Sequence, residues 1–283
     1  MKKPIVRLSS LQLTNIKNVK KGAIYMPDTV NKILSADKAE ILGIYGQNGS
    51  GKTAIVDALY FLQKVMIGAD LDQSLEDYMD MDSDTAEIFA DFNLFMNGIV
   101  FEIGYRLSLS REEKVVVISR ETLSGAKNEN GIRTNKTVFM DYQRDQTNTI
   151  FKPQKRLDEI LEENKDIKTD LIVARKMAEK SNCSYIFGES SREIFCREYK
   201  NGFQQFSVII SSLFEFALKD LFVIRNTHSG VISANFVLPM AFRIENDNIG
   251  AKGDFAVSLT EPILVDEERK NLLETIVEQI NIV

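Results

Sequence analysis

The chain has 283 residues, with 35 Lys and Arg against 41 Asp and Glu, which gives a formal net charge of -6. Hydrophobic residues make up 44% and charged residues 27%, which is typical of a globular protein with a packed core and excludes disordered and collagen-like classes. Two cysteines and one histidine argue against zinc-finger, His-dependent triad and disulfide-framework classes.

The sequence carries no sign of membrane insertion or secretion. Its apolar runs are far shorter than the roughly 20 residues that cross a bilayer, and its first ten residues lack the apolar stretch of a signal peptide. We therefore expect a cytoplasmic protein with no membrane partner.

The first predicted elements are strands and one helix. Residues 4–26 contain two extended segments joined by a basic stretch at 17–21. A short apolar run at 41–45 ends at a glycine-rich loop, which predicts a buried strand. Over residues 53–66 apolar side chains recur at helical spacing and cover more than one face, which predicts a buried helix.

Residues 86–142 carry the clearest strand signal in the sequence. Apolar and polar residues alternate over 99–109, and the pair Asn97-Gly98 just before this run favours a tight hairpin turn. Similar alternation on both sides predicts an antiparallel meander with one buried and one solvent-exposed face.

After residue 142 the sequence predicts helices first, and then a strand and a last helix. Two amphipathic helices are expected around 157–167 and 171–178, followed by an apolar helix over 206–222 or a helix that runs into a strand at 221–224. Further on, we expect a strand over 236–244 and a helix over 266–283. Because no linker interrupts the sequence, it predicts one lobe, divided as 1–142, 143–225 and 226–283.

One motif carries chemistry. Residues 46–53 read G-x-x-x-x-G-K-T, a complete phosphate-binding loop between a predicted strand and a predicted helix. Glycines let the backbone amides surround a phosphate, Lys52 reaches the terminal phosphates and Thr53 offers a hydroxyl to Mg²⁺. We expect binding of a nucleotide phosphate by Gly46, Gln47, Asn48, Gly49, Ser50, Gly51, Lys52 and Thr53.

The loop and its surroundings resemble the ABC-type ATPases of the SMC and RecF kind. The segment GQNGSGKT, followed by Ala54 and by Asp57-Ala58-Leu59, matches their loop and helix. The segment LTNIKN near the start of the chain is similar to the strand that begins those proteins. The bacterial OLD-like (AAA-15-like) ATPases, often found in phage-defence loci, are the most similar group.

This resemblance implies a fold, cofactors and partners. The fold is α/β: a P-loop ABC-type nucleotide-binding lobe with an antiparallel β subdomain and a short helical insertion. ATP and Mg²⁺ are the implied cofactors, with Lys17 of the first strand turn near the nucleotide. The intact family protein is expected to form an ATP-dependent homodimer and to act on nucleic acid or an effector protein.

The rest of an ABC-type site is weakly represented. Residues 123–126, LSGA, imitate a signature motif, but they lie between predicted strands. Residues 263–267 imitate the acidic motif, with Asp266 for magnesium and Glu267 for water, although carboxylates also favour the first turn of a helix. Gln143 is one of several glutamines that the resemblance offers as a magnesium ligand.

Three functions stay open at this point. The chain reads as the N-terminal part of a longer ATPase, with its C-terminal lobe absent, so we expect little ATP turnover by this chain alone. A non-hydrolysing nucleotide-binding module is the second reading. A P-loop small-molecule kinase is the third, and the long meander at 86–142 speaks against it.

Overall fold

The computed structural model describes residues 3–31, 34–36, 39–71, 73–112, 115–144, 146, 151–152, 166–196, 204–226, 231–235 and 254–258. The chain divides into two compact units, Met1–Leu221 and Phe222–Val283. The first unit holds the phosphate-loop motif and nearly all of the described elements.

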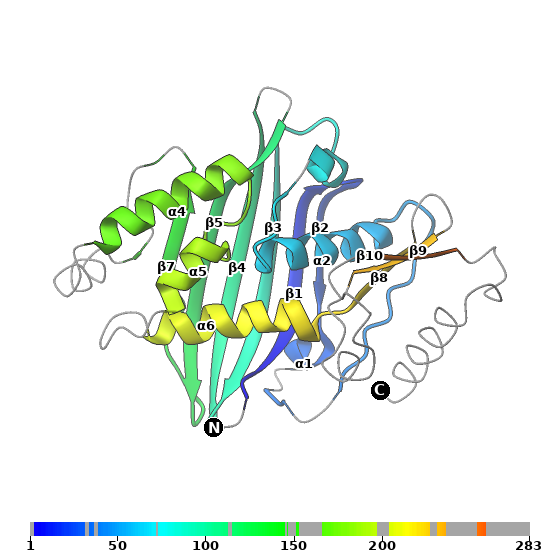
Figure 1. Cartoon of the computed structure of the whole chain (residues 1–283). Helices are drawn as coiled ribbons and strands as arrows, with labels where there is room; N and C mark the ends of the chain where they lie inside the picture. Colours follow the sequence, from blue (N-terminus) through cyan, green and yellow to red (C-terminus); the bar gives the residue numbers. More distant parts are fainter. Residues whose placement is uncertain are drawn as a thin grey trace, which may run out of the picture. The chain divides into compact units, whose positions relative to one another are not determined.

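The first unit is built on one antiparallel sheet (Figure 1). Its strands run in the order β2-β1-β3-β4-β5-β6, and β7 also pairs with β5. The strands are β1 (Ile5–Ile16), β2 (Val19–Tyr25), β3 (Thr85–Met96), β4 (Ile99–Glu112), β5 (Val115–Glu129), β6 (Ile132–Arg133) and β7 (Thr137–Gln143). The two extended segments predicted within residues 4–26 are confirmed as β1 and β2, which pair antiparallel, and the predicted meander is confirmed as well.

Alternation of side chains explains why this sheet has two different faces. On β4, Ile103, Tyr105 and Leu107 are buried, whereas Arg106 between them is exposed. Each such large apolar side chain stabilises the fold by roughly 1.5–3 kcal/mol when fully buried. Asn97 and Gly98 both have positive φ, 49° and 79°, as a two-residue hairpin turn of this twist requires.

Helices cover one face of the sheet, as Figure 1 shows. They are α2 (Lys52–Met66), α4 (Ile167–Ser181), α5 (Glu189–Cys196) and α6 (Gln204–Glu215), and α6 continues as a π-helix, η2 (Phe216–Asp220). The helix predicted at 53–66 is confirmed as α2, and the one expected around 171–178 as α4. Most of the helix expected around 157–167 lies outside the described residues.

Two short elements connect the larger ones. The helix α1 (Pro27–Val30) follows β2, and a 3₁₀ helix, η1 (Gln73–Tyr78), links α2 to β3. The ring of Tyr78 stacks on Phe61 of α2 with 4.9 Å between centroids, which fixes η1 against the buried helix.

A buried carboxylate joins the sheet to the helical layer. Glu121 of β5 is fully buried and accepts hydrogen bonds from the Tyr105 hydroxyl at 2.6 Å, the Ser184 hydroxyl at 2.5 Å and the Tyr185 amide at 2.6 Å. The last two donors belong to the segment between α4 and α5. Its position is therefore set by a side chain of the sheet.

The far end of α2 is tied to α6. The Gln63 side-chain amide donates to the backbone oxygens of Ala217 at 2.9 Å and Leu221 at 2.6 Å. These carbonyls belong to η2 and to the residue that follows it, so a polar side chain of α2 satisfies backbone groups at the irregular end of α6.

The second unit is described through three strands. β8 (Val223–Asn226), β9 (Val231–Asn235) and β10 (Asp254–Ser258) form an antiparallel sheet in the order β10-β9-β8. The alternative strand expected at 221–224 corresponds to β8. The strand predicted at 236–244 and the helix predicted at 266–283 lie outside the described residues.

The strand predicted at 41–45 is wrong. These residues carry no regular secondary structure, and Ile41 and Tyr45 are 89% and 95% exposed. A strand of this type is held by hydrogen bonds to neighbouring strands on both sides. Within the described part of the chain no strand pairs with this segment, so its apolar residues remain on the surface.

None of the helices among the described residues is both long enough and apolar enough to span a bilayer.

Candidate phosphate-binding site

The phosphate-loop motif forms an exposed turn that leads directly into α2. Gly49 and Gly51 have φ values of 83° and 89°, in the left-handed region that glycine adopts without strain. Gly51 is the residue before the first turn of α2, and no described side chain caps that turn. The first amides of α2 and the positive end of its dipole therefore face the loop, which favours an anion there.

Lys52 lies across the loop. Its ammonium group donates to the backbone oxygens of Gly46 and Gln47, both at 2.7 Å, and it lies 3.3 Å from the Ser50 hydroxyl. The positive charge is thus held above the same turn that presents the helix amides. Thr53, the next residue, is exposed on the first turn of α2.

The turn between β1 and β2 packs against this loop and against α2 behind it. The Lys17 ammonium forms an ion pair with Asp57, a carboxylate of α2 that is only 5% exposed. The Asn18 side-chain amide donates to the Gly49 backbone oxygen at 2.5 Å. Lys17, which the family resemblance places near the nucleotide, therefore lies beside the phosphate loop through its contact with Asp57.

Sequence reasoning missed Asp57 and Asn18 as members of the site. Asp57 is a charged residue on a helix face that is otherwise apolar, and a buried carboxylate requires a partner. That pattern could have pointed to Asp57. Nothing in the local sequence links Asn18 to Gly49, because the contact joins residues 31 positions apart.

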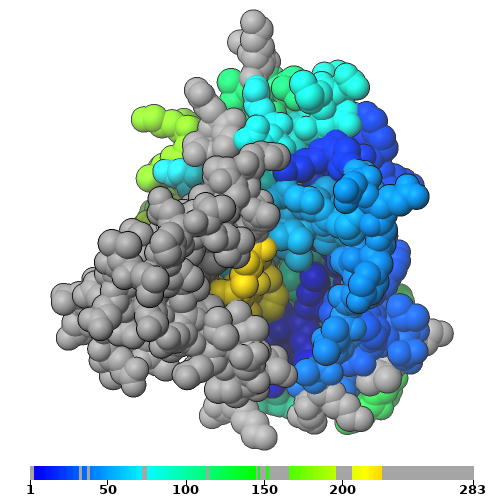
Figure 2. Space-filling model, turned by 90° about the vertical axis from the view of Figure 1, so that its right-hand side faces the viewer, coloured from blue at the N-terminus to red at the C-terminus, as the bar shows by residue number. Residues whose placement is uncertain are grey.

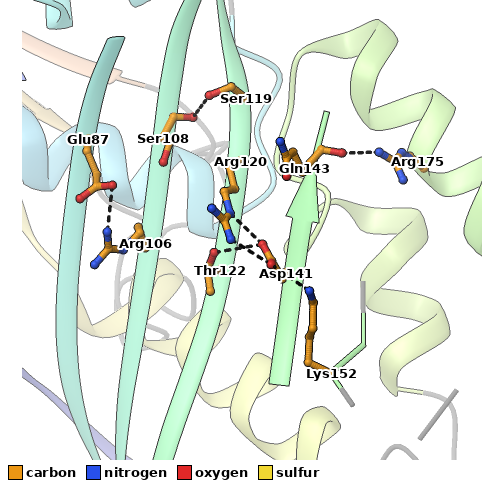
Figure 3. A network of polar contacts seen from close by, with 10 residues as sticks. All are labelled: Glu87, Arg106, Ser108, Ser119, Arg120, Thr122, Asp141, Gln143, Lys152 and Arg175. Atoms are coloured by element: carbon orange, nitrogen blue, oxygen red, sulfur yellow. Dashed lines mark hydrogen bonds and ion pairs between the residues drawn. The ribbon is translucent and has the colours of Figure 1, made fainter. Parts of the chain in front are cut away.

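Gln143 lies elsewhere in the sheet. It is the last residue of β7, opposite Arg120 of β5, and its backbone oxygen accepts a hydrogen bond from Arg175 of α4. Figure 3 shows it near the ion pair between Arg120 and Asp141, whose closest atoms are 2.8 Å apart. From β7 to β1 there are four strand spacings, about 19 Å along the sheet. The magnesium role of Gln143 stays a prediction.

The other expected motifs fall into two groups. Asp266 and Glu267 lie outside the described residues. Residues 123–126 lie inside β5, with Leu123 and Ala126 buried, and they do not open a helix as a signature motif would. Among the described residues, no group of three or more His, Cys, Asp or Glu side chains gathers as a metal site.

The loop therefore offers one clear chemical capability. Exposed residues at 46–50, a helix N-terminus and a lysine come together within residues 46–53. Figure 2 shows the N-terminal part of the first unit, in shades of blue, at the surface. In other proteins, backbone amides and a helix N-terminus arranged in this way favour a phosphate group.

Comparison with known proteins agrees with this chemistry. Residues 41–166 match the model of a family described as "AAA domain, putative AbiEii toxin, Type IV TA system". This is a P-loop ATPase-type family, and the matched span holds the phosphate loop, α2 and strands β3 to β7, somewhat less than half of the chain. No curated protein matches the sequence.

Proposed function

We propose that the chain binds ATP with Mg²⁺ at residues 46–53 and is the ATP-binding part of an ABC/SMC-like ATPase. The observation that supports this most strongly is the loop geometry. Two left-handed glycines and Lys52 stand at the uncapped start of α2. The match to a P-loop ATPase-type family over the same residues supports ATP as the ligand.

Each part of the loop has its own role in this proposal. The backbone amides of residues 47–51 and of the first turn of α2 bind phosphate oxygens, and Lys52 exchanges its contacts with Gly46 and Gln47 for the terminal phosphates. The Thr53 hydroxyl binds Mg²⁺, which neutralises charge on the phosphates when it is present. Lys17 contributes a second positive charge at the edge of the site.

Hydrolysis and coupling are part of the same proposal. Asp266 would take part in holding Mg²⁺ and Glu267 would polarise the attacking water. The protein would dimerise on ATP binding and drive a nucleic-acid process or act on an effector protein, as in phage defence or DNA maintenance.

A non-hydrolysing nucleotide-binding module is the second candidate, and one observation favours it. Within the described residues, the carboxylate nearest in sequence to Thr53 on α2 is Asp57, and it is engaged by Lys17 instead of standing open for a cation. Binding without turnover is the outcome that this second function requires.

Calorimetric titration with ATP and Mg²⁺ tests the proposal. Lys52→Ala removes the loop cation and should abolish measurable binding, whereas Lys64→Ala, at the other end of α2 and stacked over Tyr60, should bind like the parent. Parent-like binding by Lys52→Ala would place the site elsewhere. Turnover near or above about 1 per second that is lost in Glu267→Gln would support the ATPase, and tight binding without turnover would support the module.

A further inference from the structure

We propose that Asn18 is a positioning residue of the phosphate loop: its side-chain amide fixes the direction of the peptide group between Gly49 and Ser50. This inference rests on the proposed function for its consequence in nucleotide binding. The contact itself, from the β1–β2 turn to the loop, is a feature of the described structure.

Three consecutive residues, the two of the β1–β2 turn and the first of β2, reach the loop and its helix. Lys17 pairs with Asp57 of α2, Asn18 donates to the Gly49 oxygen at 2.5 Å, and Val19 lies against Gly51. A Cβ atom on Gly51 would stand 2.5 Å from the Val19 Cγ2 atom, so a larger residue would push the two apart, and the φ of 89° at Gly51 also favours glycine.

The turn is itself firmly held, so it can serve as a support. The Lys17 amide donates to the Tyr78 backbone oxygen at 2.9 Å, and the Asp80 amide donates to the Asn15 oxygen at the same distance. On the other side of the turn, Lys20 pairs with Asp80 at 2.5 Å. The turn is therefore fastened to the last residue of η1 and to Asp80 just beyond it, through contacts that do not involve the phosphate loop.

The held peptide follows a glycine. Because Gly49 has no side chain, this residue places little steric limit on rotation of the Gly49–Ser50 peptide. The peptide is planar and trans, so its C=O and N–H point in opposite directions. Asn18 holds the oxygen, and the Ser50 amide donates to the Gln47 oxygen at 3.2 Å. Both ends of the peptide are thus fixed.

A turned-over peptide would break the hydrogen bond from the Ser50 amide to the Gln47 oxygen and set the Gly49 oxygen against that oxygen instead. The turn that carries the loop amides would be disturbed, so fewer of these amides would be placed to donate to a phosphate. An exposed asparagine at a hairpin turn is commonly no more than a turn-forming residue. Here the side-chain hydrogen bond reaches another element, 31 residues away in sequence, and ends on the glycine peptide of the motif.

The test compares three variants at this position with one control. Asn18→Asp has the same shape but cannot donate to the Gly49 oxygen, Asn18→Ala removes the group, and Asn18→Gln keeps the amide. Asn97→Asp makes the same chemical change at another exposed hairpin turn. Two quantities are measured: hydrogen exchange of the loop amides without nucleotide, and the Kd for ATP with Mg²⁺. Thermal unfolding is followed in parallel.

We expect faster exchange of the loop amides in Asn18→Asp and Asn18→Ala, and a Kd raised roughly tenfold, with little change in the unfolding midpoint. Asn18→Gln should restore part of the affinity, and Asn97→Asp should match the parent. Parent-like loop exchange in Asn18→Asp would overturn the inference. So would an affinity loss that only follows a lowered unfolding midpoint and that Asn18→Gln does not recover. If the parent binds no ATP, the proposed function fails, and loop exchange alone decides the role of Asn18.

Discussion

Replacing Glu121 by glutamine tests whether the buried carboxylate fixes the helical layer on the sheet. The substitution keeps the size and shape of the side chain, so it opens no cavity. It replaces one of two acceptor oxygens by an NH₂ group. The two hydroxyls of Tyr105 and Ser184 share one oxygen of Glu121, and the Tyr185 amide donates to the other.

The cost of Glu121→Gln follows from this division of donors. If the remaining oxygen of the introduced glutamine stays with the two hydroxyls, its NH₂ group faces the Tyr185 amide, and a buried donor loses its acceptor. That loss destabilises a protein by about 1–3 kcal/mol. For a unit of this size each kcal/mol lowers the unfolding midpoint by roughly 2–4 °C. We therefore expect a midpoint lower by about 2–12 °C.

The pH dependence supplies a second and sharper readout. Burial raises the pKa of Glu121 above its ordinary value, and the hydrogen bonds from Ser184, Tyr105 and Tyr185 only partly oppose this. The folded state therefore binds the proton more tightly than the unfolded state. The stabilisation is complete below the unfolded pKa and is lost as pH rises through the raised folded pKa. Glutamine does not titrate, so the stability difference between parent and variant should shrink as pH rises.

Urea unfolding of both proteins over a series of pH values, followed by circular dichroism, measures this difference. As pH rises, the difference in unfolding free energy between the parent and Glu121→Gln should fall by about 1.4 kcal/mol for each pH unit by which folding raises the pKa of Glu121. A difference in unfolding free energy that grows with rising pH would refute the reasoning, because it would mean that folding favours the ionised carboxylate.

Two further substitutions test contacts at the C-terminal end of α2 and just beyond it. Gly68→Ala would bring a Cβ within 2.5 Å of the Phe187 backbone oxygen, whereas Gly98→Ala, at a similar φ, would meet nothing within 4 Å. Both variants should lose roughly 1–2 kcal/mol of unfolding free energy, because alanine is strained in the left-handed region. Gly68→Ala should lose more than this, and equal urea midpoints for the two variants would show that the Phe187 contact has no effect on stability. Gln63→Leu leaves the Ala217 and Leu221 oxygens without their donor, so it should lower stability by about 1–3 kcal/mol and speed hydrogen exchange near η2. Parent-like exchange there would show that these bonds do not hold the π-helix.

Local patterns were enough to predict the sheet and α2. Alternation over 99–109 and the Asn97-Gly98 pair report directly on strand faces and turn geometry, which depend on neighbouring residues. The helix at 53–66 is likewise a matter of spacing, and the loop motif before it needs no tertiary information to be recognised.

Pairing between distant segments was not predictable in the same way. The run at 41–45 has a strand-like composition, yet a strand exists only if another strand takes up its hydrogen bonds. The contact of Asn18 with Gly49 and that of Gln63 with Leu221 join positions 31 and 158 residues apart. No spacing rule within one segment encodes such contacts, so these parts of the site and of its support emerged only from the structure.

The order of the strands also has a consequence during protein synthesis. In the sheet, β1 lies between β2 and β3, and its residue Ser10 bonds Asp91 of β3, 81 positions later. At about 5–20 residues per second, a ribosome needs roughly 4–16 s to make the chain between them. During that interval β1 has only β2 to pair with, and an isolated two-stranded hairpin is marginal in water. The strand that precedes the supporting turn is therefore paired on both sides only after β3 has been synthesised. The phosphate loop and α2 are thus made before the sheet that orients them is complete.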